Sequence, residues 1–230
     1  MARIYDTSQA TEREEGIADA TGALRRGELA IIPTDTVYGV AADAFSPLAV
    51  MSLLGAKGRG REMPPPVLIS NVGTVNALAR DIPGWVHALL DQFWPGPLTV
   101  VCHQQTALKW DLGETRGTVA MRMPKDDVAL ELLGRTGPLA VSSANLSGQP
   151  AALTAQEASD MLGPATAVIL DSGPAAVGEG STILDCTQMQ PRILREGALK
   201  TSEIVAALAA LDIELAAFGD GNGEDATARA

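Results

Sequence analysis

The sequence predicts a single α/β (α+β) domain built around one mixed sheet. The chain has 230 residues, which is within reach of one domain with a short extension, and 46% of them are hydrophobic. Aromatic residues make up only 3%, so the core must be aliphatic. Short apolar runs alternate with longer stretches of helical character, which is the pattern of strands and helices that share one sheet.

Seven stretches have the composition and the boundary residues of helices. The first contains Glu14 and Glu15 in its early turns and is followed by Gly27, a residue type that often ends a helix. Ser46 and Pro47 form a helix start, because serine is a favoured N-cap and proline is tolerated at the first helical position. The predicted helices cover 11–26, 47–56, 74–80, 85–93, 126–133, 155–162 and 202–216.

Nine short apolar runs are predicted to be strands, because turn-forming residues bound them. The first run stops at Pro33. The segment 57–66 is predicted to be irregular, because it contains Gly58, Gly60 and three consecutive prolines. The predicted strands cover 29–32, 37–42, 67–70, 98–102, 118–123, 139–142, 167–170, 182–184 and 192–194.

The chain is expected to divide into a main domain over 8–200, a C-terminal helix over 201–218 and a disordered acidic tail over 219–230. No apolar run approaches the roughly 18 residues that a membrane span needs, so no membrane partner is expected. Cys102 and Cys186 are too few for a disulfide scaffold, and no apolar signal segment opens the chain. A cytoplasmic location is therefore expected.

The formal net charge is −11, from 17 basic and 28 acidic residues. A protein that neutralises many phosphates of a duplex carries a basic face, so this charge argues against nucleic acid as the ligand. Bases nevertheless gather at Lys57, Arg59 and Arg61, with Arg122 later in the chain. The arrangement suits a small anionic ligand, although a solvated charged loop explains the run at 57–61 equally well.

Several common catalytic signatures are absent from the sequence. It contains no Walker-type phosphate loop, no G-x-G-x-x-G dinucleotide fingerprint, no G-x-S-x-G elbow and no H-E-x-x-H metal motif. His87 and His103 are the two histidines, and together with the two cysteines they lack the spacing of a zinc site. No metal held by the protein alone is therefore expected.

Five regions are rich in hydroxyl, charged, glycine or proline residues. Most of them adjoin predicted strands, whose ends commonly bind ligands in α/β sheets, and K-G-R follows a predicted helix. Lysine supplies a point charge and arginine a bidentate fork for phosphate oxygens, and a glycine between them lets the backbone approach closely. The W-P-G-P turn is rigid and is expected to be structural. The regions are P-T-D-T-V-Y-G at 33–39, K-G-R at 57–59, W-P-G-P-L-T at 94–99, S-S-A-N-L-S-G at 142–148, and S-T-I at 181–183 together with L-R-E-G at 194–197.

The order of these segments resembles the YrdC-like threonylcarbamoyl-AMP synthase family over roughly residues 11–200. The resemblance implies a twisted mixed sheet with flanking helices and a concave basic cavity. It also implies an enzyme, an L-threonylcarbamoyladenylate synthase (nucleotidyltransferase), that condenses L-threonine, bicarbonate and ATP to threonylcarbamoyl-AMP and pyrophosphate. A partner threonylcarbamoyltransferase complex would then modify adenosine 37 of tRNAs that read ANN codons, so the chain would meet tRNA only indirectly.

The family pattern implies a role for individual residues of this chain. Lys57 and Arg59 match catalytic positions, and Arg122 suits the threonine carboxylate because a guanidinium binds a carboxylate with two parallel hydrogen bonds. Mg²⁺ is the expected cofactor, bridging ATP phosphates without a dedicated protein cage. L-Threonine is expected at Thr36, Arg122 and Ser181, and the nucleotide at Lys57, Arg59, Thr118, Ser143, Asn145 and Arg195.

The chain departs from the family pattern at two positions. Met63 stands where a polar residue is usual, and Leu153 stands where a threonine is usual, with Thr154 next to it.

Two other functions fit part of the pattern. A non-catalytic module for double-stranded RNA or tRNA would use the same basic cavity, but the acidic charge and few aromatic rings disfavour it. A carbamoyl-adenylate-forming domain of the hydrogenase-maturation type would be part of a much longer chain.

Overall fold

The structure, a computed structural model, describes residues 2–216 of the chain. Its strands are β1 Arg3–Asp6, β2 Ala30–Ile32, β3 Gly39–Asp43, β4 Val67–Leu68, β5 Ala79–Arg80, β6 Leu98–Gln104, β7 Thr118–Arg122, β8 Leu139–Ser143, β9 Val168–Asp171, β10 Thr182–Asp185 and β11 Arg192–Arg195. Its helices are α1 Ala10–Arg25, α2 Pro47–Lys57, α3 Val75–Leu78, α4 Gly84–Phe93, α5 Asp127–Thr136, α6 Ala155–Leu162 and α7 Thr201–Ala209, with 3₁₀ turns at Val72–Thr74 and Gly163–Ala165.

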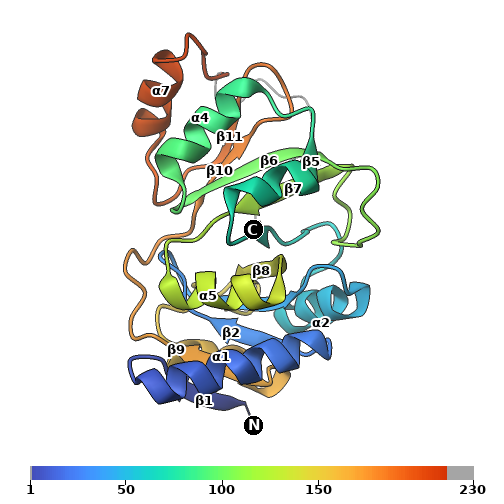
Figure 1. The fold of residues 1–230 in the computed structure, drawn as a ribbon, viewed down its shortest axis with the longest axis vertical. Coiled ribbons are helices and arrows are strands. Elements are labelled where there is room, and N and C mark those ends of the chain that lie inside the picture. Colours follow the sequence, from blue (N-terminus) through green and yellow to red (C-terminus); the bar gives the residue numbers. More distant parts are fainter. Residues whose placement is uncertain (1, 217–230) are drawn as a thin grey trace.

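Within residues 2–216 the strands join into one eleven-stranded sheet (Figure 1). The order is β1-β9-β2-β3-β8-β4-β7-β6-β10-β11, and β5 pairs with β6 beside this path. Strand β2 pairs in parallel with β9 and antiparallel with β3, so both kinds of pairing occur side by side. The predicted mixed sheet with flanking helices is therefore confirmed.

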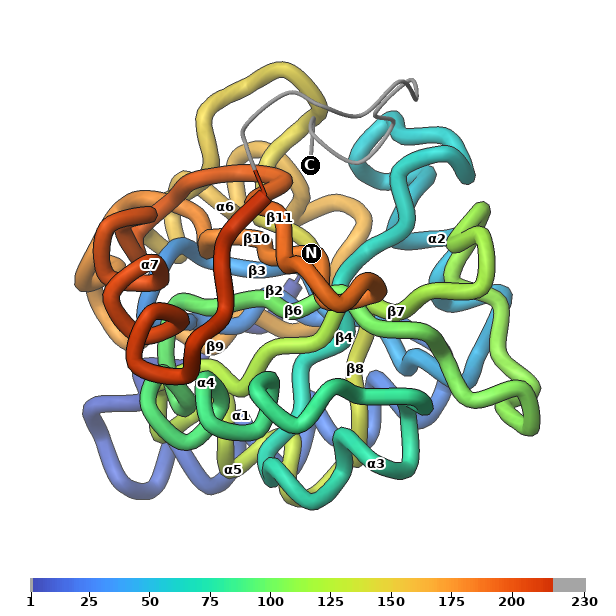
Figure 2. The backbone as a smooth tube through the Cα atoms, turned by 90° about the horizontal axis from the view of Figure 1, so that it is seen from above, coloured from blue at the N-terminus to red at the C-terminus, as the bar shows by residue number. Residues whose placement is uncertain are grey.

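The central strands separate two hydrophobic cores, because successive side chains point to opposite faces of a sheet. Ala30 and Ile32 of β2 pack with buried residues of α1 and α5, whereas Ile31 between them joins a larger core that includes α2, α4, α6 and α7. Figure 1 shows α1 and α5 near one end of the molecule and α4 with α7 at the other. Seen from above, α7 and α2 lie on opposite sides with the strands between them (Figure 2).

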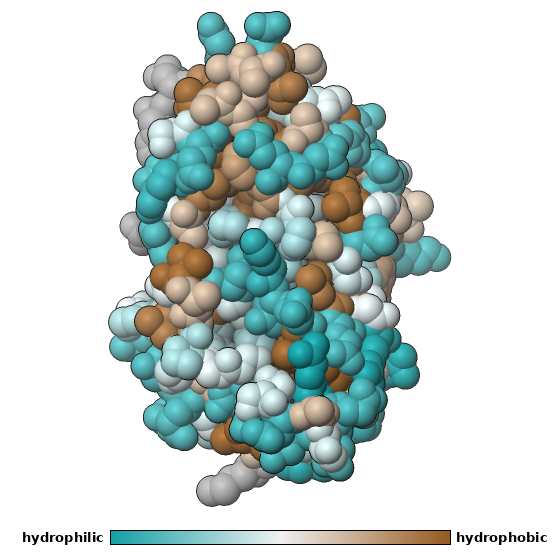
Figure 3. All heavy atoms as spheres, turned by 60° about the vertical axis from the view of Figure 1, so that its left-hand side comes forward, coloured by the Kyte–Doolittle hydropathy of each residue, from teal (hydrophilic) through white to brown (hydrophobic). Residues whose placement is uncertain are grey.

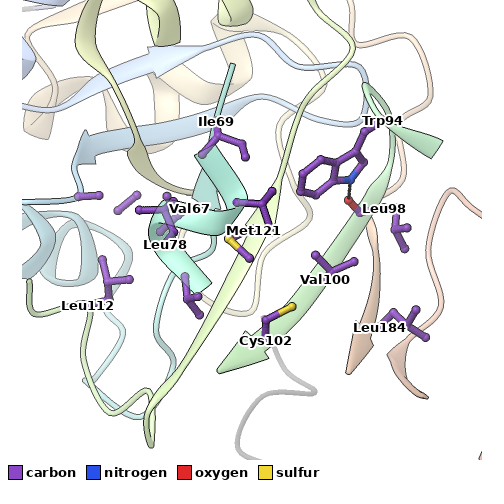
Figure 4. Packing of buried hydrophobic residues seen from close by; sticks show 14 of the residues in the cluster. Val67, Ile69, Leu78, Trp94, Leu98, Val100, Cys102, Leu112, Met121 and Leu184 are labelled. Carbon is purple, nitrogen blue, oxygen red and sulfur yellow. Dashed lines mark hydrogen bonds between the residues drawn. The ribbon is translucent and has the colours of Figure 1, made fainter. Parts of the chain in front are cut away.

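The W-P-G-P turn closes the larger core at the start of β6. The indole N–H of Trp94 donates a hydrogen bond to the carbonyl oxygen of Leu98 at 2.7 Å (Figure 4). The Trp94–Pro95 peptide bond is cis. Around it, aliphatic side chains such as Val100 pack with Met121, as the scarcity of aromatic residues predicts. The structural role expected for this turn is confirmed.

Strand β1 is the element that sequence patterning misses. It is an edge strand of four residues, Arg-Ile-Tyr-Asp, of which three are exposed, so it shows no apolar run. Its backbone pairs in parallel with β9, from Arg3 opposite Val168 to Asp6 opposite Asp171. The sheet therefore begins ahead of the domain boundary predicted at residue 8.

Two predicted helices are shorter in the structure. The stretch 74–80 contains only α3, because Ala79 and Arg80 leave the helix to pair with β6. Helix α7 ends at Ala209 instead of 216, because Asp212 adopts a left-handed φ of 55° and the Ile213 N–H bonds back to the Leu208 carbonyl at 3.0 Å. The acidic tail predicted over 219–230 lies outside the described residues.

The helices of the described residues are too short or too polar to cross a membrane. Among residues 2–216, no helix has both the length and the apolar character needed to cross a bilayer. The face drawn in Figure 3 instead carries hydrophilic and hydrophobic side chains that alternate over short distances.

The packing of α1 on β1 gives a test of this arrangement. Glycine to alanine in a helix normally stabilises by about 1 kcal/mol, but a Cβ on Gly16 would lie 2.7 Å from Tyr5 Cβ. We expect Gly16→Ala to lower the free energy of unfolding by about 1–3 kcal/mol in urea denaturation, because β1 must move.

Gly22→Ala, in the same helix, is the matched control. The nearest heavy atom to its added Cβ is the end of the flexible Arg26 side chain, at 3.2 Å. This variant should raise the free energy of unfolding by up to about 1 kcal/mol. An equal gain at Gly16 would contradict the close contact between α1 and β1.

Candidate active site

A cavity of about 480 Å³ opens at the strand ends, which is within the usual size of small-molecule sites. Every sequence segment singled out above contributes to its wall, so the convergence of these strand ends is confirmed. Seven predicted site residues line it: Thr36, Arg59, Arg122, Ser143, Asn145, Ser181 and Arg195. Lys57 and Thr118 are absent from this lining within residues 2–216.

Arg122, the last residue of β7, joins three segments of the chain. Its Nε donates to the carbonyl of Gly96 at 3.0 Å, its Nη1 to Thr36 Oγ1 at 2.8 Å, and its Nη2 to Asp35 Oδ1. Burial lowers the pKa of the Arg122 guanidinium, and the Asp35 carboxylate opposes that shift. A guanidinium has five N–H groups, and three of those of Arg122 donate to these acceptors within residues 2–216.

Buried hydroxyl groups surround Arg122. Thr36 Oγ1 lies 3.0 Å from Thr34 Oγ1, which donates in turn to the carbonyl of Val37 at 2.6 Å. On the facing wall, Ser181 Oγ lies 2.8 Å from Thr99 Oγ1. These hydroxyls are held in fixed positions and suit a small polar ligand whose carboxylate meets Arg122.

Arg59 stands just beyond α2, where Gly58 takes a left-handed φ of 66° and turns the chain. Its Nη1 donates to Ser142 Oγ at 3.1 Å. Its Nε is buried and has no hydrogen-bond partner among the described residues. A buried donor without an acceptor costs about 1–3 kcal/mol, so Arg59 is arranged to receive an acceptor from a ligand.

Arg195, at the end of β11, completes a cluster of three guanidinium groups. Its Nη2 donates to the carbonyl of Ser181 at 2.9 Å. Burial lowers the pKa of Arg195, and the charges of Arg59 and Arg122 lower it further. Three cations close enough to perturb one another favour a ligand that carries several negative charges.

Lys57 lies beneath the cavity and holds the loop that follows β8. Its amine donates to the Asn145 carbonyl at 2.8 Å, to Asn145 Oδ1 at 3.0 Å and to the Ser143 carbonyl. Its own carbonyl accepts from the Ser147 N–H at 2.9 Å. Burial and then the Arg59 charge lower the pKa of the Lys57 amine to about 7. The lysine therefore shapes the wall of the cavity from below.

Thr118 and Met63 lie together beside a second cavity of about 60 Å³. The Thr118 hydroxyl donates to the carbonyl of Thr115 at 2.7 Å. This small cavity adjoins the large one, because Pro66 and Ile183 line both. Thr118 thus lies beside the large cavity but does not line it, unlike most of the other residues predicted to bind the nucleotide.

Thr154 does not take the place of the threonine that Leu153 replaces. Its hydroxyl accepts from the Glu157 N–H at 3.2 Å and caps the N-terminus of α6. Leu153 itself is partly exposed, at 37%. Thr154 therefore caps a helix and does not supply the hydroxyl that the family pattern has at position 153.

Sequence reasoning misses several residues of the site. Asp35 reads as a turn-capping residue of its motif, yet it pairs with Arg122 across 87 positions in the chain. Thr99 belongs to a segment that reads as structural, and its hydroxyl nevertheless faces Ser181. Neither pairing can be predicted from the spacing of residues in the sequence. The only sequence feature near these positions is the group of turn-forming residues beside them. Gln149 and Glu179 also line the cavity and lie outside the segments that the sequence singles out, whereas Thr34, Ser142 and Glu196 belong to those segments but carry no predicted role.

A mixed sheet whose strand ends gather three arginines and several buried hydroxyls around one cavity defines an α/β enzyme that acts on a small anionic ligand. Comparison with known proteins is consistent with this class. The family model Sua5_yciO_yrdC, described as "Telomere recombination", matches residues 22–197. The chain therefore belongs to the Sua5/YciO/YrdC family.

Individual relatives match most of the chain. A protein of Mycobacterium tuberculosis is 47% identical over 208 residues, covering 90% of this chain and 96% of its own length. The threonylcarbamoyl-AMP synthase of Bacillus subtilis is 34% identical over 210 residues, covering 90% of this chain and 61% of that protein. The crystal structure of P. abyssi Sua5 complexed with L-threonine has a TM-score of 0.87 at 32% identity, covering all of this chain and 66% of that one.

The position of Lys57 gives a prediction about stability. Lys57→Met removes the donor from four oxygen atoms, two on Ser143 and two on Asn145. We expect the free energy of unfolding to fall by about 2–4 kcal/mol, because buried acceptors are left unpaired. Lys109→Met, at an exposed lysine, is the control and should change it by less than about 0.5 kcal/mol. Equal effects in guanidinium denaturation would show that Lys57 does not hold the loop.

Proposed function

We propose that this chain condenses L-threonine, bicarbonate and ATP to threonylcarbamoyl-AMP and pyrophosphate. The observation that carries the proposal is the meeting of Arg59, Arg122 and Arg195 in one cavity lined by buried hydroxyls. A triphosphate needs several cationic donors, and an amino-acid carboxylate needs one bidentate partner. The names of the B. subtilis and P. abyssi relatives support the same reaction.

The cavity offers separate positions for the two larger substrates. L-Threonine is proposed to bind at Thr36, Arg122 and Ser181, with its carboxylate on the two N–H groups of Arg122 that the protein leaves open. ATP is proposed to bind at Arg59, Ser143 and Arg195 and to extend towards Thr118. Asn145 and Lys57 would contribute mainly by holding the end of β8, which carries Ser143, and the loop that follows it.

The proposed reaction forms two bonds in turn. The neutral amine of threonine attacks the carbon of bicarbonate, which gives a carbamate and releases water. A carbamate oxygen then attacks the α-phosphorus of ATP, and the bond to the bridging oxygen breaks as pyrophosphate leaves. Negative charge grows on the leaving group, where Arg59 and Arg195 would stabilise it by fixed positive charge in a water-poor site.

We further propose that Mg²⁺ accompanies ATP. Within residues 2–216, no group of three or more His, Cys, Asp or Glu side chains is placed to hold a metal ion. The cavity fits an ion held mostly by phosphate oxygens and water, with Glu179 and Glu196 in the wall. Mg²⁺ would neutralise phosphate charge.

The product is proposed to serve tRNA modification through a partner. Threonylcarbamoyl-AMP is an activated acyl donor, so a separate threonylcarbamoyltransferase complex would pass its acyl group to adenosine 37 of tRNAs that read ANN codons. The net charge of −11 supports indirect contact with tRNA, because direct binding relies on neutralising many phosphates.

The test is pyrophosphate release by the purified protein with ATP and Mg²⁺. We expect release to require both L-threonine and bicarbonate. Arg59→Ala should reduce it by at least about 100-fold, because transition-state charge loses a buried cation. Arg61→Ala is the matched control two residues away: its guanidinium is exposed and bonds to Asp111 at 2.8 Å.

Activity of Arg61→Ala is expected to stay within about two-fold of wild type. Full activity of Arg59→Ala would remove the role proposed for that residue. Absence of threonine-dependent release from the wild type, followed by binding of a tRNA or an RNA duplex at physiological salt, would replace the proposed reaction with the RNA-binding alternative.

A further inference from the structure

We infer that Asp35 is a positioning residue that orients Arg122 for the carboxylate of the amino-acid substrate, an inference that rests on the function proposed above. Asp35 does not line the cavity and lies behind Arg122. Its Oδ1 accepts from Arg122 Nη2 and also from the Lys125 backbone N–H at 2.9 Å. The carboxylate therefore ties the end of β7 to the residues that follow it.

The three acceptors around Arg122 fix the plane of its guanidinium. Gly96 accepts from Nε, Thr36 from Nη1 and Asp35 from Nη2, so each nitrogen of the guanidinium has a protein acceptor. One N–H on Nη1 and one on Nη2 are left, which is the number a carboxylate needs for two parallel hydrogen bonds. Without Asp35, Nη2 loses its partner, and only the two bonds to the neutral acceptors Gly96 and Thr36 still oppose rotation of the guanidinium.

Burial makes this contact more than a surface ion pair. The side chains of Arg122 and Asp35 are 7% and 10% exposed. Of the three groups that accept from Arg122, Asp35 is the charged one, so it also balances the charge of a buried cation. When one partner of a buried pair is removed, the other is left uncompensated and seeks new acceptors. Removal of Asp35 should therefore displace Arg122 from its binding geometry.

A second carboxylate, that of Asp126, provides a control that distinguishes a positioning role of Asp35 from a role in stability alone. Asp126 caps α5 by accepting from the Ala129 N–H at 2.9 Å, and no hydrogen bond joins it to Arg122 within residues 2–216. Asp126→Ala should loosen the same region without turning the guanidinium. It is the matched control for Asp35→Ala.

The experiment measures kcat and KM for L-threonine and for ATP by pyrophosphate release. We expect Asp35→Ala to raise the KM for threonine about 10–100-fold, the effect of losing one charge-assisted hydrogen bond, with the KM for ATP within about two-fold of wild type. Asp35→Asn should show a smaller rise, because the amide oxygen still accepts from Nη2. Asp126→Ala should lower the melting temperature and leave the threonine KM unchanged.

A double variant tests whether Asp35 acts through Arg122. Arg122→Ala should reduce threonine kcat/KM strongly, and adding Asp35→Ala should reduce it no further. Losses that multiply would overturn the inference, as would an unchanged threonine KM in Asp35→Ala or an equal rise in Asp126→Ala. If Asp35→Ala does not fold, Asp35→Ser takes its place with the same expectations.

Failure of the proposed function would be recognised separately. Wild-type protein without threonine-dependent pyrophosphate release overturns the reaction. Calorimetric titration of L-threonine into wild type and Asp35→Ala then tests the inference alone. Tighter binding by wild type supports the positioning role, and equal binding or no binding overturns it.

Discussion

The burial of positive charge is the constraint on which the site depends. Lys57 and Arg122 are buried and Arg59 and Arg195 are partly buried, and this burial lowers the pKa of each. A buried cation is tolerated only where oxygen atoms surround it. Carbonyl and hydroxyl groups at strand ends supply most of these oxygens here, so the sheet must bring those ends together before any ligand can bind.

In the K-x-R and S-x-N segments, some residues hold the protein structure and others face the cavity. Lys57 bonds to Asn145 below the surface, and the Asn145 amide donates to the Leu146 and Gln149 carbonyls, which completes the loop. Arg59 instead reaches Ser142 and keeps its Nε directed away from any protein acceptor in the described chain. The two motifs therefore contain both residues that can contact a ligand and residues that hold those ligand-contacting residues in place.

Local sequence signals predict most elements of this fold, because prolines, glycines and helix caps interrupt clear apolar runs. They fail where pairing with distant strands decides the local structure: β1 is an exposed edge strand without an apolar run, and Ala79 leaves a helical stretch to pair with β6.

For the site, the order of the motifs identifies the residues, but not their roles. The bond from Arg122 to Asp35 joins positions that no periodicity relates, and the buried position of Lys57 follows only from the packing of α2 on β3 and the bonds of its amine to Ser143 and Asn145.

The acidic net charge and the arginine-lined cavity are compatible because they act over different distances. Charges on the exposed surface are screened within about 8–10 Å at physiological salt, whereas buried groups are screened far less. A ligand inside the cavity is therefore governed by the three guanidiniums near it, and a long polyanion outside meets the acidic surface as a whole. The acidic charge that disfavours a nucleic-acid duplex thus has little effect on a small anion inside the cavity.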